Sequence, residues 1–328
     1  MKVLVNGASG FVGSHAIRAL LDGGHDVRAS ARSADRVRRA LEPLGCADAV
    51  ETVEGDVTDV ADVAATLEGR EAAVHVAAVY SYDARRGKEM LHDNVQSTEN
   101  VIGAAAALGL DPIVHISSYV ALLPSDVTVT RDSPPGRPRT PYALSKARSD
   151  EVARSFQSNG TSVTIIYPGM VWGPDDPVVG ESSLFARSVL DGKLPLGLPD
   201  TVPVVDVRDV AAVARGVMRP GHGPRRYMAT GESVPMQRVQ TIVAEAGGTR
   251  PPRGTAPGWF LLGLGRVSDW EQRVVPVRLP INYQAPWTLM TGAPCDSSET
   301  ERELGVTFRA AEESIRDTVR WLFEEART

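Results

Sequence analysis

Short apolar stretches recur along the first half of the chain, and polar or amphipathic stretches long enough for a helix separate them. Short apolar runs bounded by turn residues are typical of strands buried in a sheet. Strands that alternate with helices predict repeated βα units and a parallel sheet. We therefore expect an α/β fold, a Rossmann-type doubly wound parallel sheet, with strands at 2–6, 26–31, 50–53, 72–77, 112–117 and 162–167.

The first predicted strand runs into a glycine-rich turn, and an amphipathic helix follows the turn. Three glycines with this spacing let backbone N–H groups and the positive end of the helix approach a pyrophosphate. Many tight strand-to-helix turns bind nothing, so the turn alone leaves both interpretations open. The candidate dinucleotide-binding residues here are Gly7, Ser9, Gly10, Phe11, Val12 and Gly13.

A second motif, Tyr142-Ala143-Leu144-Ser145-Lys146, carries candidate acid/base chemistry. A phenol has a pKa near ~10, so it exchanges a proton near neutral pH only where its phenolate is stabilised. Lys146 lies one helical turn from Tyr142 on the same face, and its ammonium would lower the pKa of that phenol. The alternative is an amphipathic helix with a surface tyrosine and a solvated lysine.

A third element, the apolar run Val114-His115-Ile116, ends in the hydroxyls of Ser117 and Ser118. In a doubly wound sheet the ligand crevice lies beyond the carboxyl ends of the strands. Ser118 would therefore face the cofactor beside Tyr142. The alternative is a serine that caps the next turn.

In this combination the sequence resembles the extended short-chain dehydrogenase/reductase superfamily, the NAD(P)-dependent epimerase/dehydratase family. The pattern is closest to dihydroflavonol-4-reductase-like and 3β-hydroxysteroid dehydrogenase-like members. The resemblance covers nearly the whole chain. The matching pieces, in order, are residues 7–13, Gly55-Asp56-Val57, Val76-Ala77-Ala78, Asn94-Val95, Ser117-Ser118, Tyr142 to Lys146, 168–174 and 205–211.

The resemblance implies a role for each matching residue. Tyr142 would be the acid/base, Lys146 would tune it and bind the nicotinamide ribose, and Ser118 would polarise the substrate oxygen. The further cofactor contacts it implies are Asp56 and Val57 at the adenine, Ala77, Ala78 and Val79 along the cleft, Asn94 near the active site, and Pro168, Gly169 and Val171 by the nicotinamide. Tyr167 is a departure, because many relatives have arginine there, and the change could alter a buried ion pair.

The end of the second predicted strand bears on the choice between NADP and NAD. A ribose 2′-hydroxyl calls for a carboxylate there, and none is present. Arg32 instead suits a 2′-phosphate through charge-assisted hydrogen bonds, with Ser33 and Arg36 close in sequence. We therefore expect NADP, with NAD as the alternative; in the other interpretation Arg32 belongs to the solvated face of the next helix.

The pattern changes after about residue 168, where Pro and Gly become frequent and the alternation loses its regularity. We interpret residues 1–168 as an NAD(P)-binding Rossmann core and residues 169–328 as a mainly substrate-binding region, a smaller C-terminal domain. Residues 204–220 would return to the core, with a structural role for the acidic start of their helix. A final amphipathic helix is expected at 310–323. The proline-rich stretch 123–140 cannot be a continuous helix or strand, and is long enough for a loop over the cleft.

The composition and the cysteine content narrow the classes of protein and of partner to which the chain could belong. The 328 residues are 42% hydrophobic, enough for a proper core, and the net charge of −6 argues against a nucleic-acid partner. Cys46 and Cys295 have no metal spacing, as expected of a reduced cytoplasmic protein, and we expect neither a metal site nor a disulfide. The apolar start is too short for a signal peptide, and the apolar stretch 257–265 is too short to span a membrane. That stretch is a candidate buried helix, substrate entrance or membrane-surface contact.

The main hypothesis is an NADP(H)-dependent oxidoreductase that moves hydride between nicotinamide and a carbonyl or secondary alcohol of a small, apolar or aromatic substrate. Tyr80 and Tyr82 are candidate substrate contacts, whereas His75 and His115 are expected to be satisfied core residues. The alternatives are an NAD-dependent nucleotide-sugar epimerase or dehydratase, and a non-catalytic NADP-sensing regulator. The resemblance also implies a possible homodimer through helices near 94–108 and 142–157.

Overall fold

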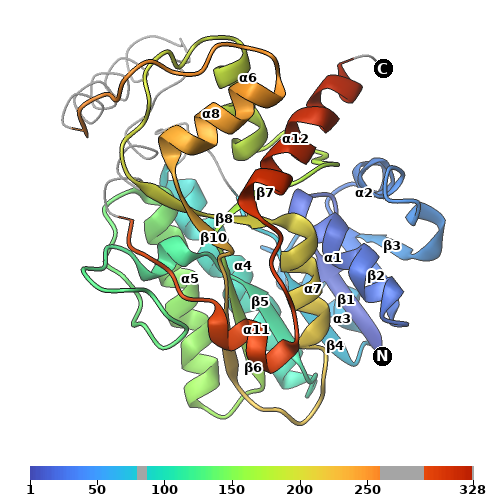
Figure 1. Cartoon of the computed structure of the whole chain (residues 1–328). Helices are drawn as coiled ribbons and strands as arrows, with labels where there is room; N and C mark the ends of the chain where they lie inside the picture. Colours follow the sequence, from blue (N-terminus) through green and yellow to red (C-terminus); the bar gives the residue numbers. More distant parts are fainter. Residues whose placement is uncertain (80–86, 259–291, 327–328) are drawn as a thin grey trace.

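A seven-stranded sheet organises the protein, as the computed structural model shows for residues 1–79, 87–258 and 292–326 (Figure 1). The strand order is β3-β2-β1-β4-β5-β6-β9, and each neighbouring pair is parallel. This is the predicted doubly wound α/β fold. The strands are β1 (Lys2–Asn6), β2 (Asp26–Ala31), β3 (Glu51–Glu54), β4 (Ala72–His75), β5 (Ile113–Ile116), β6 (Val163–Pro168) and β9 (Arg225–Ala229).

Helices cover both faces of this sheet. On one face lie α1 (Phe11–Asp22), α2 (Ala34–Leu41) and α7 (Val207–Gly216). On the other lie α3 (Val60–Leu67), α4 (Gly87–Ala107) and α5 (Pro141–Ser158), while short 3₁₀ turns stand at Ala47–Ala49 and Tyr119–Leu122. Each crossover helix therefore returns the chain to the start of the next parallel strand.

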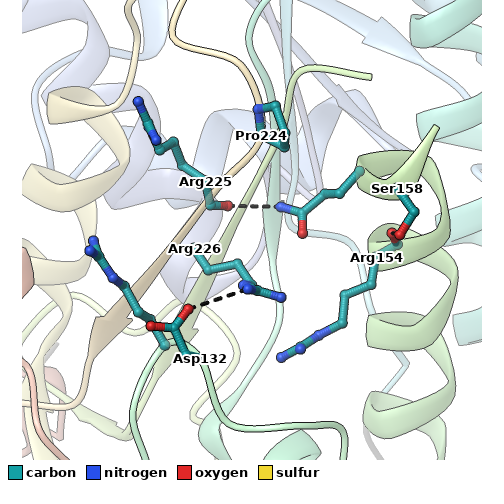
Figure 2. Close-up of a pocket in the computed structure, with 8 residues that line it drawn as sticks. Asp132, Arg154, Ser158, Pro224, Arg225 and Arg226 are labelled. Carbon is teal, nitrogen blue, oxygen red and sulfur yellow. Dashed lines mark hydrogen bonds and ion pairs between the residues drawn. The ribbon is translucent and has the colours of Figure 1, made fainter. Parts of the chain in front are cut away.

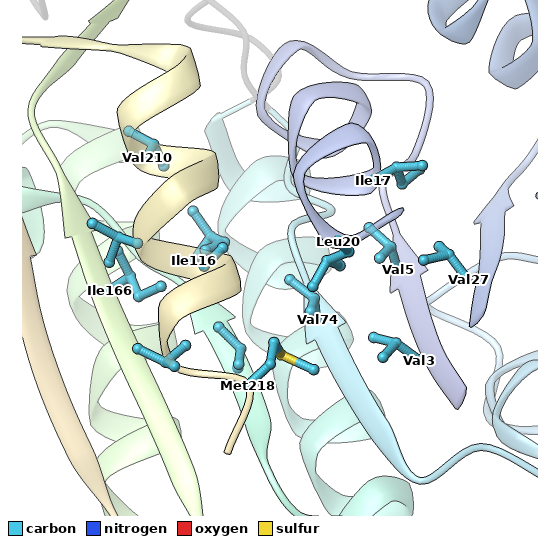
Figure 3. Close-up of a cluster of buried hydrophobic side chains, with 14 of the residues drawn as sticks. Val3, Val5, Ile17, Leu20, Val27, Val74, Ile116, Ile166, Val210 and Met218 are labelled. Atoms are coloured by element: carbon cyan, nitrogen blue, oxygen red, sulfur yellow. The ribbon is translucent and has the colours of Figure 1, made fainter. Parts of the chain in front are cut away.

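The packing of the core explains why apolar runs in the sequence predicted the strands. Along β1, Val3 and Val5 pack into the cluster beneath α1 and α7, which Figure 3 shows, whereas Leu4 packs on the opposite face. A strand covered on both faces must be apolar at successive positions. All six predicted strands are present, with ends that differ by at most two residues from those expected.

The chain after β6 builds a smaller three-stranded sheet in the order β10-β8-β7. Its strands are β7 (Met170–Trp172), β8 (Thr201–Asp206) and β10 (Glu232–Pro235). Three helices pack with it around Trp172: α6 (Glu181–Leu190), α8 (Met236–Ala246) and α12 (Ala311–Glu325), the last of which was predicted. The short α11 (Ser298–Leu304) lies against β9.

Two segments from the second half of the chain belong with the main sheet: α7 packs on one of its faces, and β9 adds a strand at its edge. The helix α7 begins where the sequence indicated, with Asp206 as its N-cap accepting from Arg208 N at 2.8 Å. The strand β9, which was not predicted from the sequence, pairs with β6 as the seventh strand.

The stretch 123–140 is irregular after the 3₁₀ turn, and its Val129 N donates to Pro294 O at 2.7 Å. The division at residue 168 stays a prediction.

Two helical glycines give a matched test of the packing. A Cβ at Gly13 would lie 2.2 Å from Gly7 O, whereas one at Gly103 would lie 3.6 Å from the Phe156 ring. We expect Gly13→Ala to lower the free energy of unfolding by about 2 kcal/mol, because backbone must move. Gly103→Ala should raise it by about 0.5–1 kcal/mol, through helix propensity. Urea denaturation measures the free energy of unfolding of both variants. Equal changes in the two variants would contradict the close approach of Gly13 to Gly7 O.

Candidate active site

The glycine turn lies where the sheet order reverses, between β1 and β4. Gly7 has a φ of +71°, and a Cβ there would stand 2.6 Å from Ala77 N. The turn is closed by Gly10 N, which donates to Gly7 O at 3.0 Å. Within the described residues, no side chain caps the start of α1 at Gly10. Open N–H groups at a helix start, beside a backbone that tolerates no Cβ, fit a pyrophosphate.

Asn6 fixes the two loops that border this crevice. Its Oδ1 accepts from Val76 N and Ala77 N, both at 3.1 Å, and lies 2.9 Å from His75 Nδ1. The side chain therefore ties the end of β1 to the loop after β4, where the predicted cofactor residues 77–79 stand. Asn6 was not among the site residues predicted from the sequence, although a polar residue at the end of an apolar strand could have indicated it.

Two of the three candidate catalytic side chains, Ser118 and Tyr142, meet beyond the carboxyl end of β5. Ser118 follows β5, and its Oγ accepts from Val120 N at 3.4 Å at the start of the 3₁₀ turn, so it also caps that turn. Tyr142 and Lys146 lie in the first two turns of α5, which begins with Pro141. The Ser118 hydroxyl is hydrogen-bonded to the Tyr142 phenol. The structure thus brings Ser118 and Tyr142 together, with Lys146 one turn farther along.

A network between α4 and α5 holds this part of α5. Asn94 Nδ2 donates to Ser145 Oγ at 3.0 Å and to Val79 O at 2.9 Å, while its Oδ1 accepts from Val79 N at 2.6 Å. Ser145 Oγ in turn donates to Tyr142 O at 2.8 Å. Asn94 is therefore buried as a positioning residue that connects the β4 loop to the catalytic helix.

Burial sets the charge states of the acid/base pair. It raises the pKa of Tyr142 to about 12, although the hydrogen bond with Ser118 acts in the opposite direction. It lowers the pKa of Lys146 to about 8. The pKa of Tyr142 is thus raised and not lowered as expected from the sequence, because burial penalises the charged phenolate.

Glu181, the first residue of α6, is a site residue that the sequence analysis did not find. Its negative charge raises the pKa of Tyr142, and burial raises the pKa of the Glu181 carboxyl to about 8. The next residue fixes its place, because Ser182 Oγ donates to Val171 O at 2.5 Å. The Glu181 carboxyl, at the start of α6, therefore acts electrostatically on the Tyr142 phenol.

The remaining predicted cofactor residues lie along the same edge of the sheet. Arg32 follows β2 and is exposed, and its charge lowers the pKa of Asp56 in the loop after β3, where Val57 also stands. Glu54 stands beside them, with its Oε1 accepting from Ala34 N at 2.9 Å. Pro168 ends β6, and Gly169 N donates to Ala229 O at 3.0 Å before Val171 enters β7.

The two buried histidines of β4 and β5 differ. His75 Nδ1 lies 2.9 Å from Asn6 Oδ1 and its Nε2 lies 3.4 Å from Thr98 Oγ1, as expected of a satisfied core residue. For His115 that expectation is wrong, because neither ring nitrogen has a hydrogen-bond partner in the described part of the chain. The rings stack with centroids 5.3 Å apart, and burial lowers the pKa of both.

Several sequence-based candidates fall outside the described residues: Tyr80, Tyr82 and most of the apolar stretch 257–265. Both cysteines are free. Among the helices that the structure describes, none is long and apolar enough to cross a membrane.

Comparisons with known proteins identify the family of the chain. The model of the NAD dependent epimerase/dehydratase family matches residues 3–228. The chain belongs to this family. Sterol demethylase protein B of Methylococcus capsulatus is 32% identical to it over 99% of both chains. A putative dihydroflavonol 4-reductase of Synechocystis is 27% identical, over 97% of this chain and 93% of the relative.

The solved structures include DesIV, a dTDP-glucose 4,6-dehydratase from Streptomyces venezuelae with NAD and TYD bound. It is 25% identical, with a TM-score of 0.76 and coverage of 100% of this chain and 98% of that chain. This chain is accordingly an NAD(P)-dependent enzyme of the extended short-chain dehydrogenase/reductase type.

The buried ammonium of Lys146 predicts a gain in stability when it is removed. Its pKa falls from 10.5 to about 8 on folding, which corresponds to a cost of about 3 kcal/mol while both states are protonated. We expect Lys146→Met to raise the free energy of unfolding of the cofactor-free protein at pH 7. The wild-type protein should gain stability as the pH rises from 8 towards 10.5, so the difference should shrink there. Urea denaturation at several pH values measures the free energy of unfolding of both proteins. A Lys146→Met variant less stable than wild-type protein at pH 7 would contradict the expected gain.

Proposed function

We propose that the protein is an NADP(H)-dependent oxidoreductase that interconverts a carbonyl and a secondary alcohol on a small apolar or aromatic substrate. The observation that carries this proposal is the hydrogen bond between Ser118 and Tyr142 at the carboxyl end of β5, with buried Lys146 one turn along α5. The relatives named sterol demethylase protein B and dihydroflavonol 4-reductase support an apolar substrate with rings.

In this mechanism the bound nicotinamide supplies or accepts the hydride. Tyr142 donates its phenolic proton to the carbonyl oxygen during reduction and takes the proton from the alcohol during oxidation. Ser118 holds the same oxygen by a hydrogen bond. The ammonium of Lys146 stabilises the phenolate left after proton donation, in a site where water is largely excluded. Burial raises the pKa of Tyr142, and the charge of Glu181 adds to that effect when its carboxyl is ionised, so the phenol is protonated near neutral pH and can donate its proton in a reduction.

The choice of NADP rests on Arg32. Among the described residues its guanidinium makes no ion pair, and it is exposed beside the crevice, where a 2′-phosphate would accept from it. Glu54 and Asp56 stand at the same edge of the sheet, and Arg32 supplies a positive charge beside them.

An NAD-dependent nucleotide-sugar epimerase or dehydratase is the second candidate function. The observation in its favour is the likeness to DesIV, whose structure holds NAD and TYD. In that reaction Tyr142 would take a proton from a sugar hydroxyl, and the cofactor would return to its starting state within one turnover. Arg32 argues against this candidate because a 2′-hydroxyl does not call for a guanidinium.

Replacement of Tyr142 tests the acid/base role. We expect Tyr142→Phe to keep cofactor affinity and to lower kcat by about 100-fold or more, because the oxygen loses its proton donor. Stopped-flow measurement of NADPH oxidation with a panel of apolar ketones measures kcat, and NADPH fluorescence measures affinity. Unchanged turnover in this variant would exclude Tyr142 as the acid/base.

Replacement of Arg32 tests the cofactor. We expect wild-type protein to bind NADPH at least about tenfold more tightly than NADH, and Arg32→Ala to remove most of that preference. Arg39→Ala is the matched control, because Arg39 is an exposed arginine of the same region that bonds only to Asp35 O among the described residues. Tighter NADH binding, or NAD that stays bound through purification, would instead favour the epimerase or dehydratase.

A further inference from the structure

A cavity of about 590 Å³ lies away from the catalytic residues, between α5, β9 and the loop before α5 (Figure 2). Arg225 opens β9 and Ser158 ends α5, so the cavity lies toward the amino ends of the parallel strands. Gln157 Nε2 closes one wall by donating to Val163 O at 2.8 Å and to Arg225 O at 2.9 Å. Tyr142, by contrast, stands at the other end of α5. The cavity is therefore separate from the active site.

The lining is rich in guanidinium groups. Arg131, Arg154, Arg225 and Arg226 all contribute, whereas Asp132 is the single carboxylate among the lining residues that the structure describes. Figure 2 shows Arg154 reaching from α5 and Arg226 from β9 into the same space, with Asp132 opposite. Four guanidinium groups and one carboxylate among these lining residues predict an affinity for anions.

Arg154 is held rigidly at the wall. Its Nε donates to Asp150 Oδ2 at 2.7 Å, and its Nη2 donates to Tyr167 Oη and to Ser133 O, both at 2.9 Å. Tyr167 Oη donates in turn to Asp150 Oδ1 at 2.7 Å. These bonds leave both N–H groups of Arg154 Nη1 without a partner in the described part of the chain. A preorganised guanidinium with spare donors loses little entropy when it binds an oxyanion.

Arg226 is only weakly compensated. Its Nη2 lies 3.3 Å from Asp132 Oδ1, and the Asp132 side chain is 74% exposed. The other basic wall is better compensated, because Arg131 pairs with Glu299 at 2.7 Å and Glu303 at 2.6 Å. An exposed ion pair such as Arg226–Asp132 contributes roughly 0–1 kcal/mol to stability. An incoming dianion can therefore take the place of the Asp132 carboxylate at Arg226.

We propose that this cavity, between Arg154 and Arg226, is a second binding site for a phosphate-bearing small molecule. Planar guanidinium groups bind phosphate oxygens through parallel N–H donors. Arg226 would supply a weakly compensated charge, and Arg154, whose charge is paired with Asp150, would supply the two N–H groups of its Nη1. The volume admits a ligand larger than phosphate itself. The site is independent of the cofactor crevice and of the reaction catalysed there.

Inorganic pyrophosphate is the probe, titrated calorimetrically into protein already saturated with NADPH, at constant ionic strength. We expect one saturable site. Arg226→Gln should weaken binding by about tenfold or more, because a charge-assisted contact is lost. Asp132→Asn should tighten binding several-fold, because the competing carboxylate is removed, and a merely structural ion pair would not produce that gain. Thermal unfolding of each variant without ligand reports whether it folds.

Arg148→Gln is the matched control, because Arg148 is an exposed arginine of α5 that pairs with Glu151 outside the cavity. It should leave the pyrophosphate affinity unchanged. Binding that disappears when NADPH is present would assign the anion to the cofactor crevice and overturn the proposal. Equal affinities in Arg226→Gln, Asp132→Asn and wild-type protein would overturn it as well.

Discussion

Burial of the Lys146 ammonium against the ends of β4 and β5 is the constraint on which the active site depends. A charge without an ion-pair partner among the described residues costs folding free energy, so the fold around it has to be stable for other reasons. Its neighbours His75 and His115 are held neutral, and its charge helps to lower their pKa values. One buried positive charge therefore lies one helical turn from Tyr142, the phenol proposed to act as acid/base.

The crevice for the dinucleotide depends on a different constraint, the contact between the loops that follow β1 and β4. Backbone of Gly7 approaches Ala77 so closely that a Cβ has no room, and Asn6 bonds both Val76 and Ala77. The same loop continues to Val79, which Asn94 bonds to α4 and so to the catalytic helix. The proposed cofactor crevice and the part of α5 that carries Tyr142 are therefore connected through the loop after β4 and its hydrogen bonds to Asn6 and Asn94.

The sequence predicted the six strands of the core because each is buried on both faces and reads as an apolar run. It did not predict β8 or β9, because Pro203 interrupts the first and two arginines open the second. Ser118, Tyr142 and Lys146 could be proposed from motifs with fixed spacing. Glu181 could not, because its position depends on the contact of Ser182 with Val171, and such a contact leaves no spacing to recognise. The unpartnered His115 likewise depends on packing between strands.

The spacing of polar residues along α5 has a mechanical consequence. Tyr142, Lys146, Asp150 and Arg154 follow one another at intervals of four, so they share one side of the helix. The last two are fastened to Tyr167 of β6 and to Ser133, about three turns from the phenol. A slip of one residue would rotate the helix by about 100° and break that attachment. The hydrogen bonds to Tyr167 and Ser133 therefore fix the rotation of α5 about its own axis, and with it the direction in which Tyr142 points from the other end of the helix.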